Sequence, residues 1–180
     1  MYYGAIKECD IADGIGVRTT IFVSGCTNCC EGCFQPQTWD FRYGQPFTSE
    51  TEELIFEYLK PDYIRGLTVL GGEPFEPSNQ EVLVPFLEEY KRRYPGKDLW
   101  VFTGFRLDDE ITVPGEHPNC GATTDRFLAL IDVLVDGRFI LAKRDLTLKY
   151  RGSSNQRIID MNKTREKGDI VLWDESLAST

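Results

Sequence analysis

Four of the six cysteines lie within eight residues, in the stretch GCTNCCEGCFQP from Gly25 to Pro36. They are Cys26, Cys29, Cys30 and Cys33. Crowding of this kind is typical of thiols that bind a metal, because cysteines that form disulfides in secreted proteins are spread along the chain to close loops. The pattern therefore indicates a reducing compartment and a metal site formed by some or all of these thiols.

Two sets of ligands are compatible with this spacing. If all four thiols bind, two CxxC pairs fused back to back form a tetrahedral set for structural zinc. That set requires adjacent Cys29 and Cys30 to point at one ion, although neighbouring side chains project in different directions. The second set takes Cys26, Cys30 and Cys33 and leaves Cys29 out. Three thiolates from one tight loop can hold three corners of a [4Fe-4S] cluster and leave the fourth iron open to a non-protein ligand. Local geometry favours the cluster, and zinc stays the alternative.

Length and composition narrow the function further. A chain of 180 residues, 41% hydrophobic, suits one domain that needs no disulfide for stability. The net charge is −9 and the basic residues are expected to be scattered, which argues against binding to nucleic acid. The start of the chain shows no secretory signal, and no apolar run of about 18 residues is present, so we expect a cytoplasmic protein without a membrane span. A single histidine, His117, excludes a His-based triad.

Apolar β-branched runs alternate with helical patterns, which is typical of βα units and a parallel sheet. The predicted strands cover residues 17–24, 66–70, 99–103 and 131–135, with weaker candidates at 157–159 and 170–173. The predicted helices cover residues 49–59, 78–94 and 124–130. Ser49 with Glu52, and Ser78 with Glu81, are the predicted capping boxes, and Pro85 predicts a kink or a later start of the second helix.

A glycine falls at or just past the carboxyl end of each strong strand, in SGC, LGGEP, TGF and VDGRF. In a parallel βα sheet or barrel these ends share one face, where such folds place their sites, and the cysteine loop lies on that face. There are too few βα units for a closed eight-stranded barrel. We therefore expect an α/β fold, a single domain over residues 1–180 in the form of an open or partial (β/α) barrel. The Pro- and Gly-rich segment 108–122 is expected to be a surface excursion.

Several motifs together resemble one family. CTNCCEGC matches the CxxxCxxC loop of the radical S-adenosylmethionine (SAM) enzymes. The chain is similar to their short glycyl-radical-activating branch, the anaerobic ribonucleoside-triphosphate reductase-activating proteins. The resemblance covers nearly the whole chain and rests on DIADGIG, FVSGC, GCFQPQTWDF, GQPFT, LGGEP, PGKDLWVFTGF, VLVDGRF and RGSSNQR, in that order.

The resemblance implies a partial barrel of the radical SAM type and a specific reaction. Cys26, Cys30 and Cys33 would ligate a [4Fe-4S] cluster, and the amino and carboxylate groups of SAM would chelate the open iron. An electron from the reduced cluster, supplied by a donor such as flavodoxin, would split SAM into methionine and a 5′-deoxyadenosyl radical. In this family the radical takes a hydrogen atom from a backbone glycine of the partner, the catalytic subunit of the anaerobic reductase. The alternatives are activation of another glycyl-radical enzyme or a small-molecule substrate.

The resemblance also implies contacts to SAM. Gly71 and Gly72 would let the backbone approach the amino group, which a β-carbon would obstruct, and Glu73 would add charge complementarity. Gly32, Cys33 and Phe34 would line the adenine, although the wider superfamily often has an aromatic residue where Gly32 stands.

The remaining expectations concern polar residues near the strand ends and the other cysteines. Ser153 and Asn155 of RGSSNQR are expected at the ribose or carboxylate of SAM, with a self-capped polar loop as the alternative. Thr103 and Asp136 lie on the predicted site face, although Asp136-Gly137 is also an ordinary turn. Cys9 is expected to be a small buried side chain. His117 and Cys120 fall in the 108–122 segment and are not expected to form a metal site.

Overall fold

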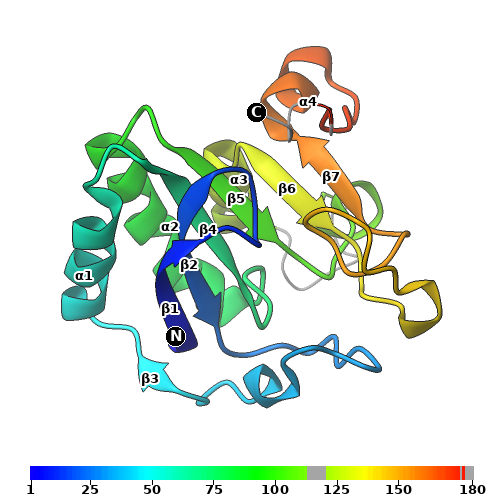
Figure 1. The fold of residues 1–180 in the computed structure, drawn as a ribbon, viewed down its shortest axis with the longest axis horizontal. Coiled ribbons are helices and arrows are strands. Elements are labelled where there is room, and N and C mark those ends of the chain that lie inside the picture. The colour runs from blue at the N-terminus through cyan, green and yellow to red at the C-terminus, as the bar shows by residue number, and fades with distance from the viewer. Residues whose placement is uncertain (113–120, 175, 177–180) are drawn as a thin grey trace.

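The computed structural model describes residues 1–112, 121–174 and 176 (Figure 1). Its described strands form one seven-stranded sheet in the order β3-β1-β2-β4-β5-β6-β7. The two end strands of this order are not paired with each other, so the sheet is open. The strands are β1 (Tyr2–Asp10), β2 (Val17–Val23), β3 (Gln45–Pro46), β4 (Ile64–Gly71), β5 (Asp98–Phe102), β6 (Val133–Asp136) and β7 (Arg157–Asp160).

The centre of the sheet is parallel, as the sequence predicts. Strands β2, β4, β5 and β6 are parallel neighbours and correspond to the four strong predicted strands. Strands β1 and β3 are antiparallel additions that the sequence analysis did not predict. The weak candidate at 157–159 is β7, but it runs antiparallel to β6 because the chain turns back on itself before it. The candidate at 170–173 forms only an isolated bridge, between Leu172 and Ile159.

The three predicted helices are present, the first with the predicted bounds and the other two with earlier starts. They are α1 (Ser49–Leu59), α2 (Pro77–Arg93) and α3 (Ala122–Leu130), and a short α4 (Met161–Lys167) follows β7. The capping box of α1 is formed by Thr48 and Thr51, one residue before the predicted pair. Helix α2 begins at Pro77 because a proline at the first helical position gives up an N–H that has no partner there in any case. It continues through Pro85 without ending.

Three short helical turns complete the described elements, η1 (Pro36–Trp39), η2 (Leu107–Ile111) and η3 (Leu141–Lys143). Turn η2 occupies the start of the predicted excursion 108–122, of which residues 113–120 lie outside the described part. None of the described helices combines the length and the apolarity that a membrane crossing requires.

The two faces of the sheet carry different cores, because successive side chains of a strand point to opposite faces. Ile21, Val69 and Val101 point to the face that α1, α2 and α3 cover, and they belong to one large buried cluster with side chains of those helices. Trp100 and Val135 point to the other face and form a smaller cluster with Ile15 and Ile158. None of the described residues of this second cluster belongs to a helix, which leaves room on that face for a cavity.

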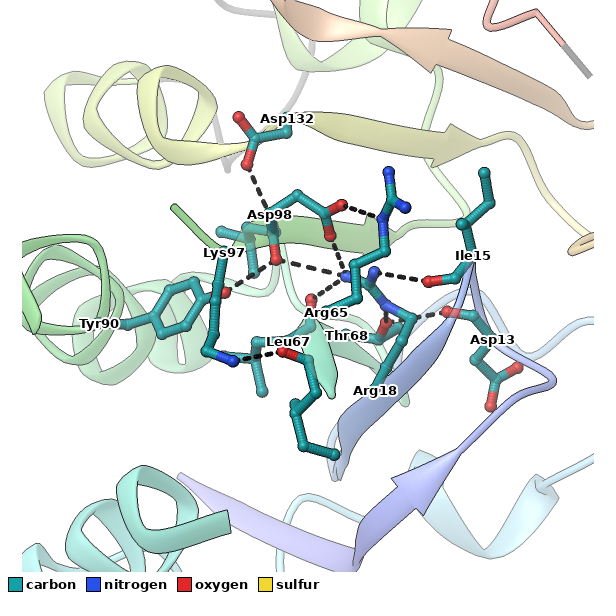
Figure 2. A network of polar contacts seen from close by, with 12 residues as sticks. Asp13, Ile15, Arg18, Arg65, Leu67, Thr68, Tyr90, Lys97, Asp98 and Asp132 are labelled. Atoms are coloured by element: carbon teal, nitrogen blue, oxygen red, sulfur yellow. Dashed lines mark hydrogen bonds and ion pairs between the residues drawn. The ribbon is translucent and has the colours of Figure 1, made fainter. Parts of the chain in front are cut away.

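A buried arginine ties the β1–β2 connection to this second face (Figure 2). Arg18 is fully buried and donates to Thr68 Oγ1 at 2.7 Å, to Ile15 O at 3.1 Å and to Leu67 O at 2.9 Å. Its guanidinium pairs with Asp98 Oδ1 at 2.6 Å. Thr68 Oγ1 in turn donates to Asp13 O at 2.8 Å. The network therefore fixes the DGIG part of the connection against β2 and β4.

Candidate functional site

A cavity of about 420 Å³ lies at the carboxyl ends of the parallel strands, on the face without long helices. Its volume is within the range of small-molecule and cofactor sites. Its wall combines the cysteine loop, the glycine-rich turn after β4, the end of β5 and the segment between β6 and β7. Its lining residues include Asp13, Cys26, Asn28, Cys30, Cys33, Phe34, Leu70, Gly71, Gly72, Glu73, Phe102, Thr103, Leu146, Leu148, Tyr150, Arg151, Gly152 and Gln156.

Three of the four clustered cysteines line the cavity, and the fourth does not. Cys26, Cys30 and Cys33 line it, and Cys29 does not. Cys29 adopts a left-handed backbone conformation with φ of 45°, is exposed, and its thiol lies 3.8 Å from Cys26 O. Cys29 is therefore an exposed residue of the loop outside the cavity lining. This arrangement corresponds to the three-ligand set that the spacing favours.

Burial favours the neutral form of two thiols of the loop, those of Cys26 and Cys30. Burial raises the pKa of Cys26 to about 12, and the nearby charge of Glu73 adds to this effect. Burial also raises the pKa of Cys30. A bound metal inverts this preference, because coordination deprotonates a thiol outright. A metal that binds these thiols therefore displaces their protons.

The three cysteines that line the cavity are the set that the loop spacing favours for an iron–sulfur cluster. Among the described residues, no group of three His, Cys, Asp or Glu side chains is arranged so that it could hold one metal ion. Cys26, Cys30 and Cys33 nevertheless all line the same cavity. A cubane cluster places its ligands at separate iron atoms, so it spans a wider set of thiols than a tetrahedral ion does.

The glycine-rich turn is attached directly to the start of the cysteine loop. Gly72 N–H donates to Val23 O at 2.7 Å, and Glu73 N–H donates to Gly25 O at 2.8 Å. Gly71 has φ of 110°, and a β-carbon there would lie 2.8 Å from the backbone of Phe22. A β-carbon at Gly72 would lie 2.6 Å from Gly25 O. The glycine pair is therefore required for the contact between two segments of the protein itself.

Glu73 is fully buried and receives four hydrogen bonds. Oε1 accepts from Phe75 N at 2.9 Å and from Thr103 Oγ1 at 2.8 Å. Oε2 accepts from Gly104 N at 2.8 Å and from Asn28 Nδ2 at 2.9 Å. Burial raises the pKa of Glu73 to about 7, although the hydrogen bonds favour the carboxylate. The side chain thus links the cysteine loop to the ends of β4 and β5.

Asn28, which the sequence analysis did not select, offers an unused acceptor in the cavity. Its Nδ2 group donates to Glu73, while its Oδ1 atom is buried and has no hydrogen-bond partner among the described residues. A buried acceptor without a partner costs free energy of about 1–3 kcal/mol, which a bound donor group removes. The sequence feature that could have indicated Asn28 is its position, as a polar residue between the predicted ligands Cys26 and Cys30.

Two further polar residues that the sequence analysis missed support the loop from α2. The Glu76 carboxylate accepts from Thr27 N at 2.8 Å and from Thr27 Oγ1 at 2.6 Å. Asn79 Nδ2 donates to Ser24 O at 3.0 Å and to Glu73 O at 2.9 Å. Both side chains are buried at the start of a helix, where a polar residue is informative because it needs a partner.

The residues predicted to line the adenine are divided between the cavity and the surface. Phe34 lines the mouth of the cavity, is 59% exposed, and packs against Phe139 with ring centroids 5.1 Å apart. Cys33 lines the cavity next to it. Gly32 does not line the cavity; it is exposed, has φ of 73°, and faces Leu141.

Thr103 and Asp136 reach the end of the sheet, but their polar atoms are used by the protein. Thr103 lines the cavity, donates to Glu73 and accepts from Phe105 N at 3.1 Å. Asp136 is fully buried outside the cavity lining, where it accepts from Leu107 N at 2.9 Å and pairs with Arg157. Thr103 therefore positions Glu73, and Asp136 joins β6 to β7 and η2.

The RGSSNQR segment reaches the cavity through other residues than the two expected. Ser153 is buried outside the lining and accepts from Ile140 N at 3.2 Å. Asn155, also outside the lining, donates to Arg138 O at 2.8 Å. The cavity is lined instead by the neighbouring residues Arg151, Gly152 and Gln156. Gln156 Oε1 accepts from Gly152 N at 2.9 Å, so the polar loop is partly self-capped.

Four other residues of interest do not belong to the cysteine loop: Asp13, Cys9, His117 and Cys120. Asp13 lines the cavity from the β1–β2 connection, and burial together with its neighbour Asp10 raises its pKa to about 7. Cys9 is exposed on β1, so its predicted burial is wrong; the side chain lies on a strand near the open edge of the sheet. His117 and Cys120 lie outside the described residues.

Comparison with known proteins agrees with this arrangement. Residues 12–159 match the family model described as a 4Fe-4S single cluster domain. The anaerobic ribonucleoside-triphosphate reductase-activating protein of Haemophilus influenzae is 42% identical over 88% of this chain and 97% of its own length. The proteins of the same name from Escherichia coli K12 and Enterobacteria phage T4 are 38% and 36% identical, over 87% and 88% of this chain and 96% and 93% of their own lengths. The chain therefore belongs to the family of anaerobic ribonucleoside-triphosphate reductase-activating proteins.

Proposed function

We propose that this chain activates an anaerobic ribonucleotide reductase by placing a glycyl radical on its catalytic subunit. One observation carries the proposal: Cys26, Cys30 and Cys33 line the same cavity as the Gly-Gly-Glu turn, and Cys29 does not line it. The family to which the chain belongs supports the same activity.

Cys26, Cys30 and Cys33 would hold a [4Fe-4S] cluster. When bound, the cluster would supply the electron for reductive cleavage of SAM to methionine, and the radical chemistry that follows would remove a hydrogen atom from the glycine of the partner. Glu76 and Asn79 keep the loop in place through hydrogen bonds to Thr27 and Ser24. No general base is needed, which agrees with a single histidine in the chain.

The cavity offers SAM a polar end and an apolar end. Asn28 Oδ1 accepts a hydrogen bond from the amino group of SAM, beside the buried carboxylate of Glu73. Phe34 provides an aromatic face for the adenine at the mouth. Leu70, Phe102 and Tyr150 form the apolar part of the wall and exclude water from the reacting carbon.

The open sheet serves as a partial barrel of the radical SAM type within a single domain over residues 1–180, with 108–122 as a surface excursion. Its open side admits the glycine of the reductase. The protein works in the cytoplasm, where a reduced donor such as flavodoxin supplies the electron, and it binds neither nucleic acid nor a membrane.

The test is radical formation with purified components. The protein is reconstituted anaerobically with iron and sulfide, reduced, and mixed with SAM and the anaerobic reductase. We expect a brown protein that bleaches with dithionite, release of 5′-deoxyadenosine, and a glycyl radical signal by electron paramagnetic resonance. A colourless protein with one zinc per chain would overturn the cluster. Release of 5′-deoxyadenosine without a radical on the reductase would point to another glycyl-radical enzyme or to a small-molecule substrate.

A further inference from the structure

The segment from Arg138 to Arg151, here named the basic strap, concentrates positive charge at the mouth of the cavity. It carries five basic residues and one acidic residue, in a chain with a net charge of −9. The basic residues are thus not evenly scattered, contrary to the expectation from sequence. The five are Arg138, Lys143, Arg144, Lys149 and Arg151.

The basic strap packs directly against the cysteine loop. A β-carbon on Gly32 would lie 2.9 Å from Leu141, and the Arg144 guanidinium lies 5.4 Å from the centre of the Phe34 ring. The strap is also folded back on the polar loop that follows it, because Ser154 N–H donates to Lys143 O at 2.9 Å. These contacts hold the strap beside the thiols as part of the rim.

The positive charges in the middle of the strap are available to a partner. Lys143, Arg144 and Lys149 are exposed, and none of them forms an ion pair with a described residue. Arg157 and Arg93, elsewhere on the molecule, are paired with two carboxylates each. Unpaired cations of one sign at a cavity mouth attract a partner of opposite charge and accelerate its association.

Apolar side chains are exposed among these charges. Leu146 is 78% exposed and lines the cavity, and Leu141 and Ile140 are 42% and 39% exposed. Phe34, on the adjoining cysteine loop, adds an exposed ring. An apolar centre with a charged border is typical of protein–protein interfaces.

We propose that the basic strap docks the segment of the reductase that carries the glycine, through carboxylates on that segment and apolar side chains beside the glycine. The inference rests on the proposed function, since the glycine must enter the cavity that Leu146, Leu148 and Tyr150 of the strap line. Apolar side chains of the segment pack on Leu146 and Leu141. Its carboxylates meet Lys143 and Lys149.

The test uses the reconstituted protein with the double substitution Lys143→Glu/Lys149→Glu. We expect the reductase concentration that gives half-maximal radical formation to rise about tenfold, and its dependence on salt to weaken, because rim charges govern association. Iron content and the release of 5′-deoxyadenosine in the absence of reductase stay unchanged, since neither lysine lines the cavity. Lys167→Glu, an exposed lysine on α4 without an ion pair to a described residue, is the matched control and leaves all values unchanged.

Three outcomes decide the inference. An unchanged half-maximal concentration overturns it. A defect that is present with a protein electron donor but absent with dithionite also overturns it, and assigns the strap to the donor. If the double variant loses iron, the neutral pair Lys143→Gln/Lys149→Gln is measured instead, and a rise smaller than twofold overturns the inference. Failure of the wild-type protein to place a radical on the reductase would contradict the proposed function itself, so the two failures are distinguishable.

Discussion

The hydroxyl of Thr103 donates a 2.8 Å hydrogen bond to Glu73 Oε1, although 30 residues separate them in the chain. Glu73 follows β4 and Thr103 follows β5, so this bond joins two strand ends at the rim of the cavity. The same carboxylate accepts from Asn28 in the cysteine loop. Glu73 is therefore the common partner through which three segments set the shape of the site.

Removal of the Thr103 hydroxyl is expected to weaken this junction. Thr103→Val leaves a buried carboxylate oxygen with one donor fewer, which costs about 1–3 kcal/mol in the free energy of unfolding. Thr103→Ser keeps the hydroxyl and serves as the control. Denaturant unfolding of both variants under anaerobic conditions checks the difference, and equal stability of the two would show that the hydrogen bond contributes nothing.

The cysteine loop gives a prediction about iron content. Cys29→Ala is expected to retain the iron and sulfide of the wild-type protein, because the Cys29 thiol does not line the cavity. Cys26→Ala, Cys30→Ala and Cys33→Ala each remove a proposed ligand and are expected to lose most of the iron. Chemical analysis after anaerobic reconstitution checks this pattern. Loss of iron from Cys29→Ala would instead support the four-thiolate set.

Asn28 is expected to contribute to SAM binding. Asn28→Ala removes an acceptor worth about 0.5–1.5 kcal/mol, so the dissociation constant of SAM rises about tenfold at most. Calorimetric titration of the reconstituted variant measures this change, with iron content as the check that the cluster is intact. SAM affinity equal to that of the wild type would mean that another group receives the amino group.

The ion pair between the buried Arg18 and the partly exposed Asp98 is expected to matter for stability (Figure 2). Arg18→Met leaves the Asp98 carboxylate without its buried partner, and such a loss costs about 3–5 kcal/mol. The cost is expected below that range here, because the Asp98 side chain is 27% exposed and Arg65 also contacts it, at 3.2 Å. The double substitution Arg18→Met/Asp98→Asn removes both charges and is expected to be less destabilised than Arg18→Met. Denaturant unfolding compares them, and a double variant that is the less stable of the two contradicts the argument.

Asp13 is expected to make stability depend on pH. Its pKa in the folded protein is raised to about 7 from 3.8, chiefly by burial, so the folded state binds the proton more tightly than the unfolded state does. Its contribution is fully present below pH 3.8 and is lost as the pH rises to about 7. Asp13→Asn removes this loss, so the free energy of unfolding should fall less between pH 5 and pH 8 than in the wild type. Parallel pH curves for the two proteins would contradict the shift.

Local patterns in the sequence predicted the central elements of the fold. The four parallel strands and the three longer helices follow from apolar runs and helical periodicity, and both signals lie within single segments. Thr48 caps α1 one residue before the predicted cap, because several neighbouring residues can serve as a cap. The predicted capping box of Ser78 with Glu81 is wrong, since α2 begins at Pro77 and its N-cap residue, Glu76, makes no side-chain cap hydrogen bond. Strands β1 and β3 were missed because a sheet edge depends on pairing with distant residues.

The site was predictable only where a motif is contiguous. The spacing of Cys26, Cys30 and Cys33, the glycine pair and Glu73 are local features, and all of these residues line one cavity. Asn28 and Gln156 also line it, whereas Asp136, Ser153 and Asn155 do not. Neighbouring residues differ in this way because the path of each loop, which depends on packing against other segments, decides which side chain points inward.

The amino-acid sequence by itself determined the ligand spacing, the parallel βα arrangement and the concentration of glycines at the strand ends. Only the tertiary structure decided that Cys29 is left out of the cavity, that Thr103 supports Glu73, and that the basic strap borders the thiols. The physical reason is that propensity and spacing act within a segment. Burial, hydrogen-bond partners and charge proximity arise between segments, and they exist only once the chain has folded.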